Sequence, residues 1–173
     1  PVAVATTFLA EPLILILGGA QYLPASRIAL QILIWSIPVG FINSVTQYVL
    51  IAIDQQRFLT RAFLIGVTFN VVANLLLIPR YSYQAAAVNT ILSEVALLLP
   101  FYHCLRRNLG PIPWTRLAWR PAAAASAMAL TMAALRPFSL LLAFMAGMIV
   151  YPVGLVAVGA FRDADVSAIM TKL

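Results

Sequence analysis

Apolar runs of about 20 residues recur along the whole chain, and short breaks carrying charged residues, Pro or Gly separate them. A helix of that length just crosses a hydrocarbon core about 30 Å thick. The breaks therefore predict an all-α, polytopic transmembrane helical bundle of about six helices. The helices are expected at approximately residues 2–17, 28–53, 58–78, 84–105, 117–135 and 138–161, within a single transmembrane region spanning 1–173 and ending in a tail at 162–173.

The composition excludes an ordinary soluble domain. Hydrophobic residues make up 63% of the chain and charged residues only 9%, whereas a soluble domain carries about 25% charged residues. The net charge of +6 would suggest nucleic acid as the partner of a soluble protein. Here the basic residues fall at predicted helix ends rather than on one face, so we expect membrane topology, and no nucleic-acid partner, to explain them.

The chain begins inside an apolar run, without an initiating Met or a signal-peptide pattern. We therefore expect it to be the C-terminal portion of a larger protein. Its one cysteine, Cys104, excludes an internal disulfide and a multi-cysteine metal site.

The Lys and Arg residues divide unequally between alternate connections. One set of connections, together with the tail, holds eight of them: Arg57, Arg61, Arg106, Arg107, Arg116, Arg120, Arg162 and Lys172. The opposite set holds three: Arg27, Arg80 and Arg136. Because basic residues favour the cytoplasmic side of a membrane, this asymmetry predicts a cytoplasmic C-terminus.

Amide side chains recur at four-residue spacing in the third and fourth predicted helices. Asn70 and Asn74 share one helix face, as do Asn89 and Ser93. At about 1.5 Å of rise per residue, the antiparallel helices place Asn74 level with Asn89 and Asn70 level with Ser93. The favoured interpretation is two hydrogen-bonded rungs that hold this hairpin together. The alternative is that the same face lines a polar cavity and contacts a hydrophilic substrate.

The second predicted helix carries a similar polar stripe, with Asn43 and Gln47 on one face. Polar stripes on three consecutive helices exceed what helix packing usually requires. This favours a shared cavity, whose candidate lining residues are Asn43, Gln47, Asn70, Asn74 and Asn89.

Two carboxylates fall within predicted spans. Glu94 lies about 15 Å from the outer end of its helix, near the midplane, and Glu11 lies about 10 Å from the end of the first helix. A carboxylate at such depth is neutral, paired, or exposed to water in a cavity. Both are candidate sites for a coupling H⁺ or Na⁺. The alternatives are a neutral carboxyl bonded to a neighbouring helix for Glu94, and a local cap or an Arg partner for Glu11.

The sequence offers little support for an enzyme. It has no nucleophile–His–acid set, no cluster of metal-ligating residues and no phosphate-binding glycine loop, so neither a catalytic residue nor a cofactor is expected. Arg27 and Arg80 are candidates for binding a diphosphate, because a guanidinium matches phosphate oxygens with two parallel hydrogen bonds. Topology alone also accounts for both.

Small residues at four-residue spacing mark the last two predicted helices. They are Ala125, Ala129 and Ala133 in one helix, and Ala143 and Gly147 in the other. Such residues let two helix backbones approach closely in lipid, so they predict helix packing rather than chemistry.

One extended motif joins these features: two Asn four residues apart, Leu-Ile-Pro, an aromatic turn, a small-residue run and Ser-Glu. Its members are Asn70, Asn74, Leu77, Ile78, Pro79, Tyr81, Ala85, Ala86, Ala87, Ser93 and Glu94. This order resembles the oligosaccharide flippases of polysaccharide biosynthesis, within the multidrug/oligosaccharidyl-lipid/polysaccharide exporter superfamily. The upstream stretch EPLILILGGAQYLPA and the tail RDADVSAIMTKL are also similar to that family, whereas Gln84 departs from the Gly usual in that turn.

The resemblance implies that this chain is most of the C-terminal lobe of a two-lobed transporter in the bacterial inner membrane. Its substrate would be an undecaprenyl-diphosphate-linked oligosaccharide, flipped between leaflets by alternating access. Partners would be membrane lipids and, in polysaccharide assembly, the polymerase machinery. Two alternatives remain: a cation-coupled multidrug exporter of the same superfamily, and a non-transporting membrane assembly subunit.

Overall fold

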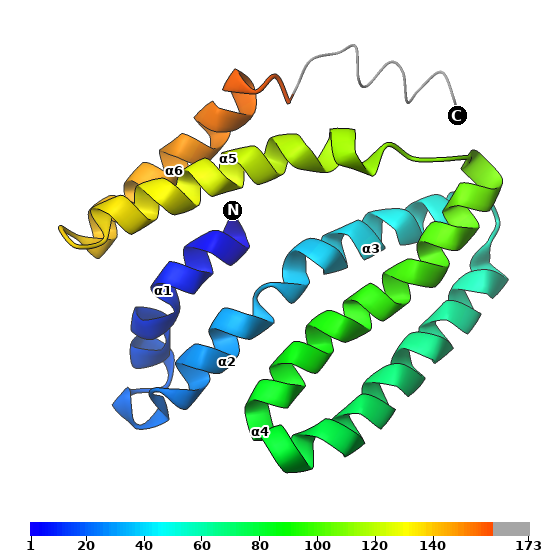
Figure 1. Cartoon of the computed structure of the whole chain (residues 1–173), viewed down its shortest axis with the longest axis horizontal. Helices are drawn as coiled ribbons and strands as arrows, with labels where there is room; N and C mark the ends of the chain where they lie inside the picture. Colours follow the sequence, from blue (N-terminus) through cyan, green and yellow to red (C-terminus); the bar gives the residue numbers. More distant parts are fainter. Residues whose placement is uncertain (161–173) are drawn as a thin grey trace. The chain divides into compact units, whose positions relative to one another are not determined.

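The computed structural model describes residues 1–160, apart from the side chain of Arg116, and in that part of the chain every regular element is a helix (Figure 1). The predicted all-α class is confirmed. The predicted tail at 162–173, with Arg162 and Lys172, lies outside the described residues. The elements are α1 (Val2–Leu17), the 3₁₀ turn η1 (Ala20–Tyr22), α2 (Ala25–Leu33), α3 (Ser36–Ala52), α4 (Gln56–Leu109), α5 (Trp114–Leu135) and α6 (Leu140–Ala157).

The helices form two compact units, each with its own packing. Unit 1 combines residues 1–9 with the chain from Pro111 onward, so it contains the start of α1 together with α5 and α6. Unit 2 is Ala10–Gly110 and contains the end of α1, α2, α3 and α4. The polar residues that the sequence singled out for function all belong to unit 2.

The predicted second helix is interrupted. It begins at Ala25 rather than Ile28, and α2 gives way to α3 around Ile34 and Trp35. The cause is Pro38, which has no backbone N–H for the carbonyl of Ile34 and whose ring would collide with that carbonyl. The Ile34 oxygen instead accepts a hydrogen bond from the backbone N–H of Ile37, at 3.2 Å, which tightens the turn.

α4 is a hairpin of two helical arms, residues 56–81 and 83–109. The chain reverses at Ser82, whose φ of 53° and ψ of −138° lie outside the helical region. The predicted turn at Pro79 to Tyr83 was too wide, because the first arm continues through Pro79. A proline there costs only one backbone hydrogen bond, and the helix ends within one turn of it.

Three stretches are long and apolar enough to cross a membrane: 25–52, 56–109 and 140–157. At about 1.5 Å per residue, each arm of α4 exceeds the hydrocarbon thickness of about 30 Å. α1 is apolar but shorter. In α5 an uninterrupted apolar stretch begins only after Arg120 and Pro121. These helices indicate membrane association, while the bundle of six spans remains a prediction.

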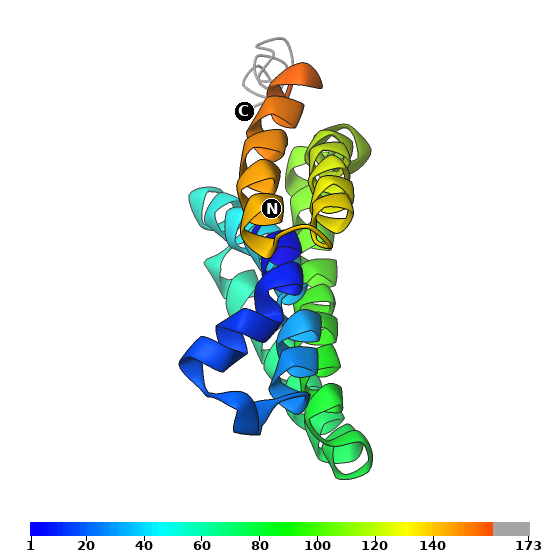
Figure 2. The same cartoon turned by 90° about the vertical axis from the view of Figure 1, so that its left-hand side faces the viewer.

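In unit 1, α5 and α6 lie side by side in both views (Figures 1 and 2). Met128 and Met132 are fully buried there against Val4 and Ala5 of α1. Of the predicted small-residue ridge, Ala143 and Gly147 are buried, and Ala125 and Ala129 pack against the core. Ala133 does not belong to that ridge, because its side chain is exposed near the end of α5.

Candidate functional site

The polar side chains of unit 2 meet in a polar seam between α3 and the two arms of α4. The polar seam comprises Asn43, Asn70, Asn74, Asn89, Ser93 and Glu94. Asn43 and Asn89 are almost fully enclosed, with 4% and 0% of their surface exposed. Glu94 lies about 18 Å along its arm from the reversal at Ser82, and so is deep within the hairpin.

Asn43 connects α3 to the carboxylate. Its amide nitrogen donates to Oε2 of Glu94, at 2.7 Å, and to the backbone carbonyl of Glu94, at 2.8 Å. Because a backbone carbonyl can only accept, this pair of bonds fixes the orientation of the amide. Gly40, one turn earlier, faces the carboxyl group: a Cβ added there would make ordinary van der Waals contact, 3.7 Å from Cδ and from Oε2 of Glu94.

Asn70 is the hub that joins the two arms of α4. Its amide nitrogen donates to Oγ of Ser93 at 2.8 Å, and its Oδ1 accepts from the amide of Asn74 at 3.0 Å. Its backbone carbonyl accepts from the amide of Asn89 at 3.0 Å. Three of the five amides predicted to line the cavity are thus bonded to one another.

The predicted rung between Asn70 and Ser93 is confirmed, whereas the one between Asn74 and Asn89 is wrong. Helical side chains tilt toward the N-terminus of their own helix, so Asn74 leans toward Asn70 instead of crossing to the other arm. Backbone carbonyls point toward the C-terminus, which brings the Asn70 oxygen within reach of Asn89. Counting residues from the turn gives the depth of each residue along its arm correctly. It does not give the direction in which each side chain or carbonyl points.

Several oxygen atoms in the polar seam accept no hydrogen bond from the described residues. The Oδ1 atoms of Asn43, Asn74 and Asn89 are buried and have no hydrogen-bond partner among the described residues. In the same part of the chain, no bond engages Oε1 of Glu94. Amide and carboxylate oxygens accept from hydroxyl donors and also bind hard cations. The polar seam therefore gathers unpartnered acceptor atoms of the kind that hydroxyl donors and cations use.

Glu11 and Arg27 form an ion pair elsewhere in unit 2. Nη1 of Arg27 lies 2.8 Å from Oε2 of Glu11, and the two side chains remain 36% and 44% exposed. The arginine partner considered for Glu11 is thus present. Each of the two residues neutralises the other's charge in this state, and neither contacts the polar seam.

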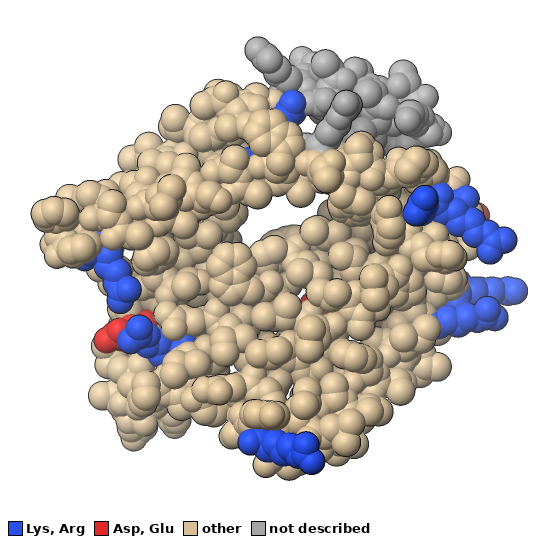
Figure 3. Space-filling view, viewed as in Figure 1, with Lys and Arg blue, Asp and Glu red and all other residues tan. Residues whose placement is uncertain are grey.

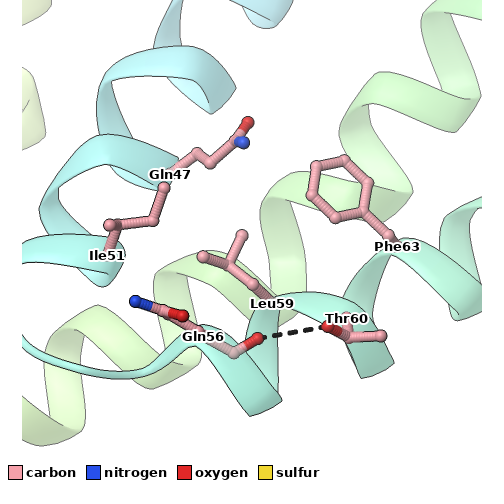
Figure 4. Close-up of a pocket in the computed structure, with 6 residues that line it drawn as sticks. All are labelled: Gln47, Ile51, Gln56, Leu59, Thr60 and Phe63. Atoms are coloured by element: carbon pink, nitrogen blue, oxygen red, sulfur yellow. Dashed lines mark hydrogen bonds between the residues drawn. The ribbon is translucent and has the colours of Figure 1, made fainter.

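The remaining candidates lie apart from the polar seam. Arg80 is exposed at the hairpin end of α4, two residues before the reversal. Gln47 lines an open groove between α3 and the start of α4, together with Gln56 and Thr60 (Figure 4). The sequence reasoning missed Gln56 and Thr60, which stand at four-residue spacing at the start of the third apolar run. Their four-residue spacing, which places them on one helix face, is the pattern by which the sequence could have identified them.

We expect Asn70→Leu to destabilise the hairpin more than Asn74→Leu. The first substitution removes two side-chain hydrogen bonds and the second removes one. Such bonds average about 0.6 kcal/mol in membranes, so the expected costs are about 1.2 and about 0.6 kcal/mol. The free energy of unfolding of the full chain in mixed detergent micelles measures both. Equal costs would contradict the role of Asn70 as hub.

Comparisons of this chain with protein-family models, curated proteins and solved structures found no match. Among the described residues, no group of three or more His, Cys, Asp or Glu side chains is arranged to hold a metal ion. The functional proposal therefore depends on the geometry of unit 2 and on the sequence resemblance.

Proposed function

We propose that this chain forms part of a membrane transporter that flips undecaprenyl-diphosphate-linked oligosaccharides by alternating access. One observation carries the proposal: a carboxylate deep in a long apolar hairpin, Glu94, is held by an amide on the neighbouring helix, Asn43. Ionisable groups at such depth are costly and usually mark ion or substrate pathways. The motif that runs from Asn70 to Glu94 supplies the substrate class.

The geometry suggests different roles for the predicted residues. Asn43, Asn70, Asn74 and Asn89 maintain the helix packing and would form the rigid wall of the cavity. Gln47 has a free path to a polar substrate, because it lines an open groove. Glu94 would bind the coupling H⁺ or Na⁺.

The diphosphate would be bound by arginine. Arg80 is exposed and forms no ion pair among the described residues, so its guanidinium can take a phosphate directly. Arg27 would first have to leave Glu11.

The distribution of Lys and Arg supports a bacterial inner-membrane location with the C-terminus in the cytoplasm. The apolar helices supply the membrane association itself. A C-terminal reporter enzyme that is active only outside the cytoplasm should remain inactive when fused to the full chain.

Burial of the amides favours one rival, a non-transporting assembly subunit. Asn43 and Asn89 are enclosed between helices, as expected if the polar seam only joins helices. A flipping assay separates the two. Vesicles containing the full-length protein should expose a fluorescent lipid-linked oligosaccharide from the inner leaflet to an external quencher faster than protein-free vesicles. Equal rates in both would leave the assembly subunit as the better account.

Thiol accessibility gives a residue-level prediction. In a Cys104→Ser background, we expect Gln47→Cys to react with a membrane-impermeant thiol reagent and Asn89→Cys to stay unreactive, because Gln47 lines the groove and Asn89 is fully buried. The labelled fraction after a fixed time measures this. A transporter should also show slower labelling at Gln47→Cys when substrate is present, because bound substrate would cover the groove, whereas a static subunit should show no change.

A further inference from the structure

The open groove of unit 2 runs between the end of α3 and the first turns of α4. Its volume is about 340 Å³. Figure 4 shows its lining, with the two glutamine amides near apolar side chains: Gln47, Ile51, Gln56, Leu59, Thr60 and Phe63. Along the first arm, the polar Gln56 and Thr60 come nearest the helix start, and the apolar Phe63 lies deeper.

Four arginines surround this end of α4. Arg57 and Arg61 follow the groove residues Gln56 and Thr60 in the sequence of the first arm without lining the groove themselves. Arg106 and Arg107 lie in the last turn of the second arm. The start of the first arm lies close to the end of the second arm. The thiol of Cys104 donates to Oε1 of Gln55 at 3.9 Å. In Figure 3, basic side chains gather at the edge of the view over these ends.

The arginines at this end of α4 outnumber the acidic residues near them in the sequence. All four arginines are exposed, and none forms an ion pair among residues 1–160. The one acidic neighbour along the chain is Asp54. Arg57 also lies in the first turn of a helix, where the partial positive charge of the backbone N–H groups disfavours a cation. An anion bound here would offset the excess positive charge of the arginines. It would also interact favourably with the backbone N–H groups at the start of the helix.

The order of the groove side chains matches the order of groups in a phospholipid. Arginines and amides stand at the helix end, where a membrane headgroup lies, and Phe63 and Leu59 stand farther in, where an acyl chain begins. Phe63 and Ile51 keep 38% and 39% of their surface exposed and can cover a hydrocarbon chain. The volume suits a headgroup and the first part of one chain rather than a whole lipid.

We infer that the groove between α3 and α4 binds an anionic phospholipid, with Arg57 and Arg61 contacting its phosphate and Gln56 and Thr60 its glycerol region. Basic pockets between membrane helices are known to hold anionic headgroups. This site is separate from the polar seam. It shares Gln47 with the proposed substrate path, but lipid binding to it can be measured in the absence of substrate. It would anchor the first arm of α4 to the interface.

The test uses the purified full chain in detergent and measures binding of phosphatidylglycerol and phosphatidylcholine by native mass spectrometry. Phosphatidylglycerol should bind at least tenfold more tightly. Arg57→Gln combined with Arg61→Gln should weaken its binding roughly 25-fold, about fivefold for each arginine. Arg136→Gln removes one charge from an exposed position outside this end of α4 and should change binding less than twofold, whereas Arg57→Gln or Arg61→Gln alone should weaken it about fivefold.

Two further measurements locate the lipid in the groove. In a background with Trp35, Trp114 and Trp119 replaced by Phe, a tryptophan introduced by Phe63→Trp should be quenched by phosphatidylglycerol with brominated chains. Ile51→Trp, made in the otherwise unchanged chain, fills the groove and keeps every arginine, and should weaken binding at least fivefold. Equal binding of the two lipids, equal weakening by Arg136→Gln and by Arg57→Gln, or no quenching would each overturn the inference.

Discussion

Glu94→Gln is expected to reduce gradient-driven export at least tenfold while leaving the amount of protein in the membrane unchanged. The glutamine side chain has nearly the same shape, and its carbonyl oxygen can accept the hydrogen bond that Asn43 now donates to Oε2 at 2.7 Å. The contact between α3 and α4 should therefore persist. What disappears is the ability to lose and regain a proton or to bind a cation. The initial export rate under an imposed H⁺ or Na⁺ gradient measures the effect.

The matched control is Glu11→Gln, which makes the same chemical change at a carboxylate outside the polar seam. Glu11 and Arg27 are partly exposed, and an exposed ion pair contributes about 0–1 kcal/mol. Its loss should change export less than threefold. Wild-type export by the Glu94→Gln variant would remove the coupling role of Glu94, whereas loss of the protein from the membrane would assign Glu94 to folding.

The second large effect is expected in unit 1, where Gly147→Leu should destabilise the packing of α5 on α6 by about 3 kcal/mol. A Cβ at Gly147 would already lie 2.8 Å from Cγ and 3.0 Å from Sδ of Met132. Met132 is fully buried, so it can yield only by repacking among the residues that enclose it. The larger side chain must therefore push the two helices apart. Resistance to unfolding in mixed micelles measures the loss.

Gly154→Ala provides the comparison on the same helix face. There an added Cβ would lie 3.4 Å from Cβ of Ala124, which is close to ordinary van der Waals contact. We expect a change below about 1 kcal/mol, since helix propensity favours Ala over Gly by a similar amount. If both variants were equally stable, close approach at Gly147 would not be what holds α5 to α6.

The two rungs of the α4 hairpin show how far sequence reasoning reaches. Four-residue spacing and helical rise placed Asn70 opposite Ser93, and the hydrogen bond at 2.8 Å agrees. The same arithmetic failed for Asn74, which bonds within its own arm. The difference lies in the direction of each side chain relative to its helix axis, which spacing alone does not specify.

Asn43 illustrates a contact that sequence could not reach. The stripe of Asn43 and Gln47 predicted a polar face, but the partner of Asn43 lies 51 residues away on another helix. Which helix covers that face depends on packing between residues distant in the chain, and here Gly40 and Asn43 both face Glu94. The same packing encloses Asn43 and leaves Gln47 in an open groove.

The sequence by itself determined the all-α class, the apolar helices and the residues with polar character inside them. These follow from composition and periodicity, which reflect the solvent around each helix. Only the tertiary structure decided that α2 and α3 are separate helices, that α4 reverses at Ser82, and that Glu94 pairs with Asn43 while Glu11 pairs with Arg27. Those outcomes depend on backbone direction and on contacts between residues distant in the chain, to which local patterns are insensitive.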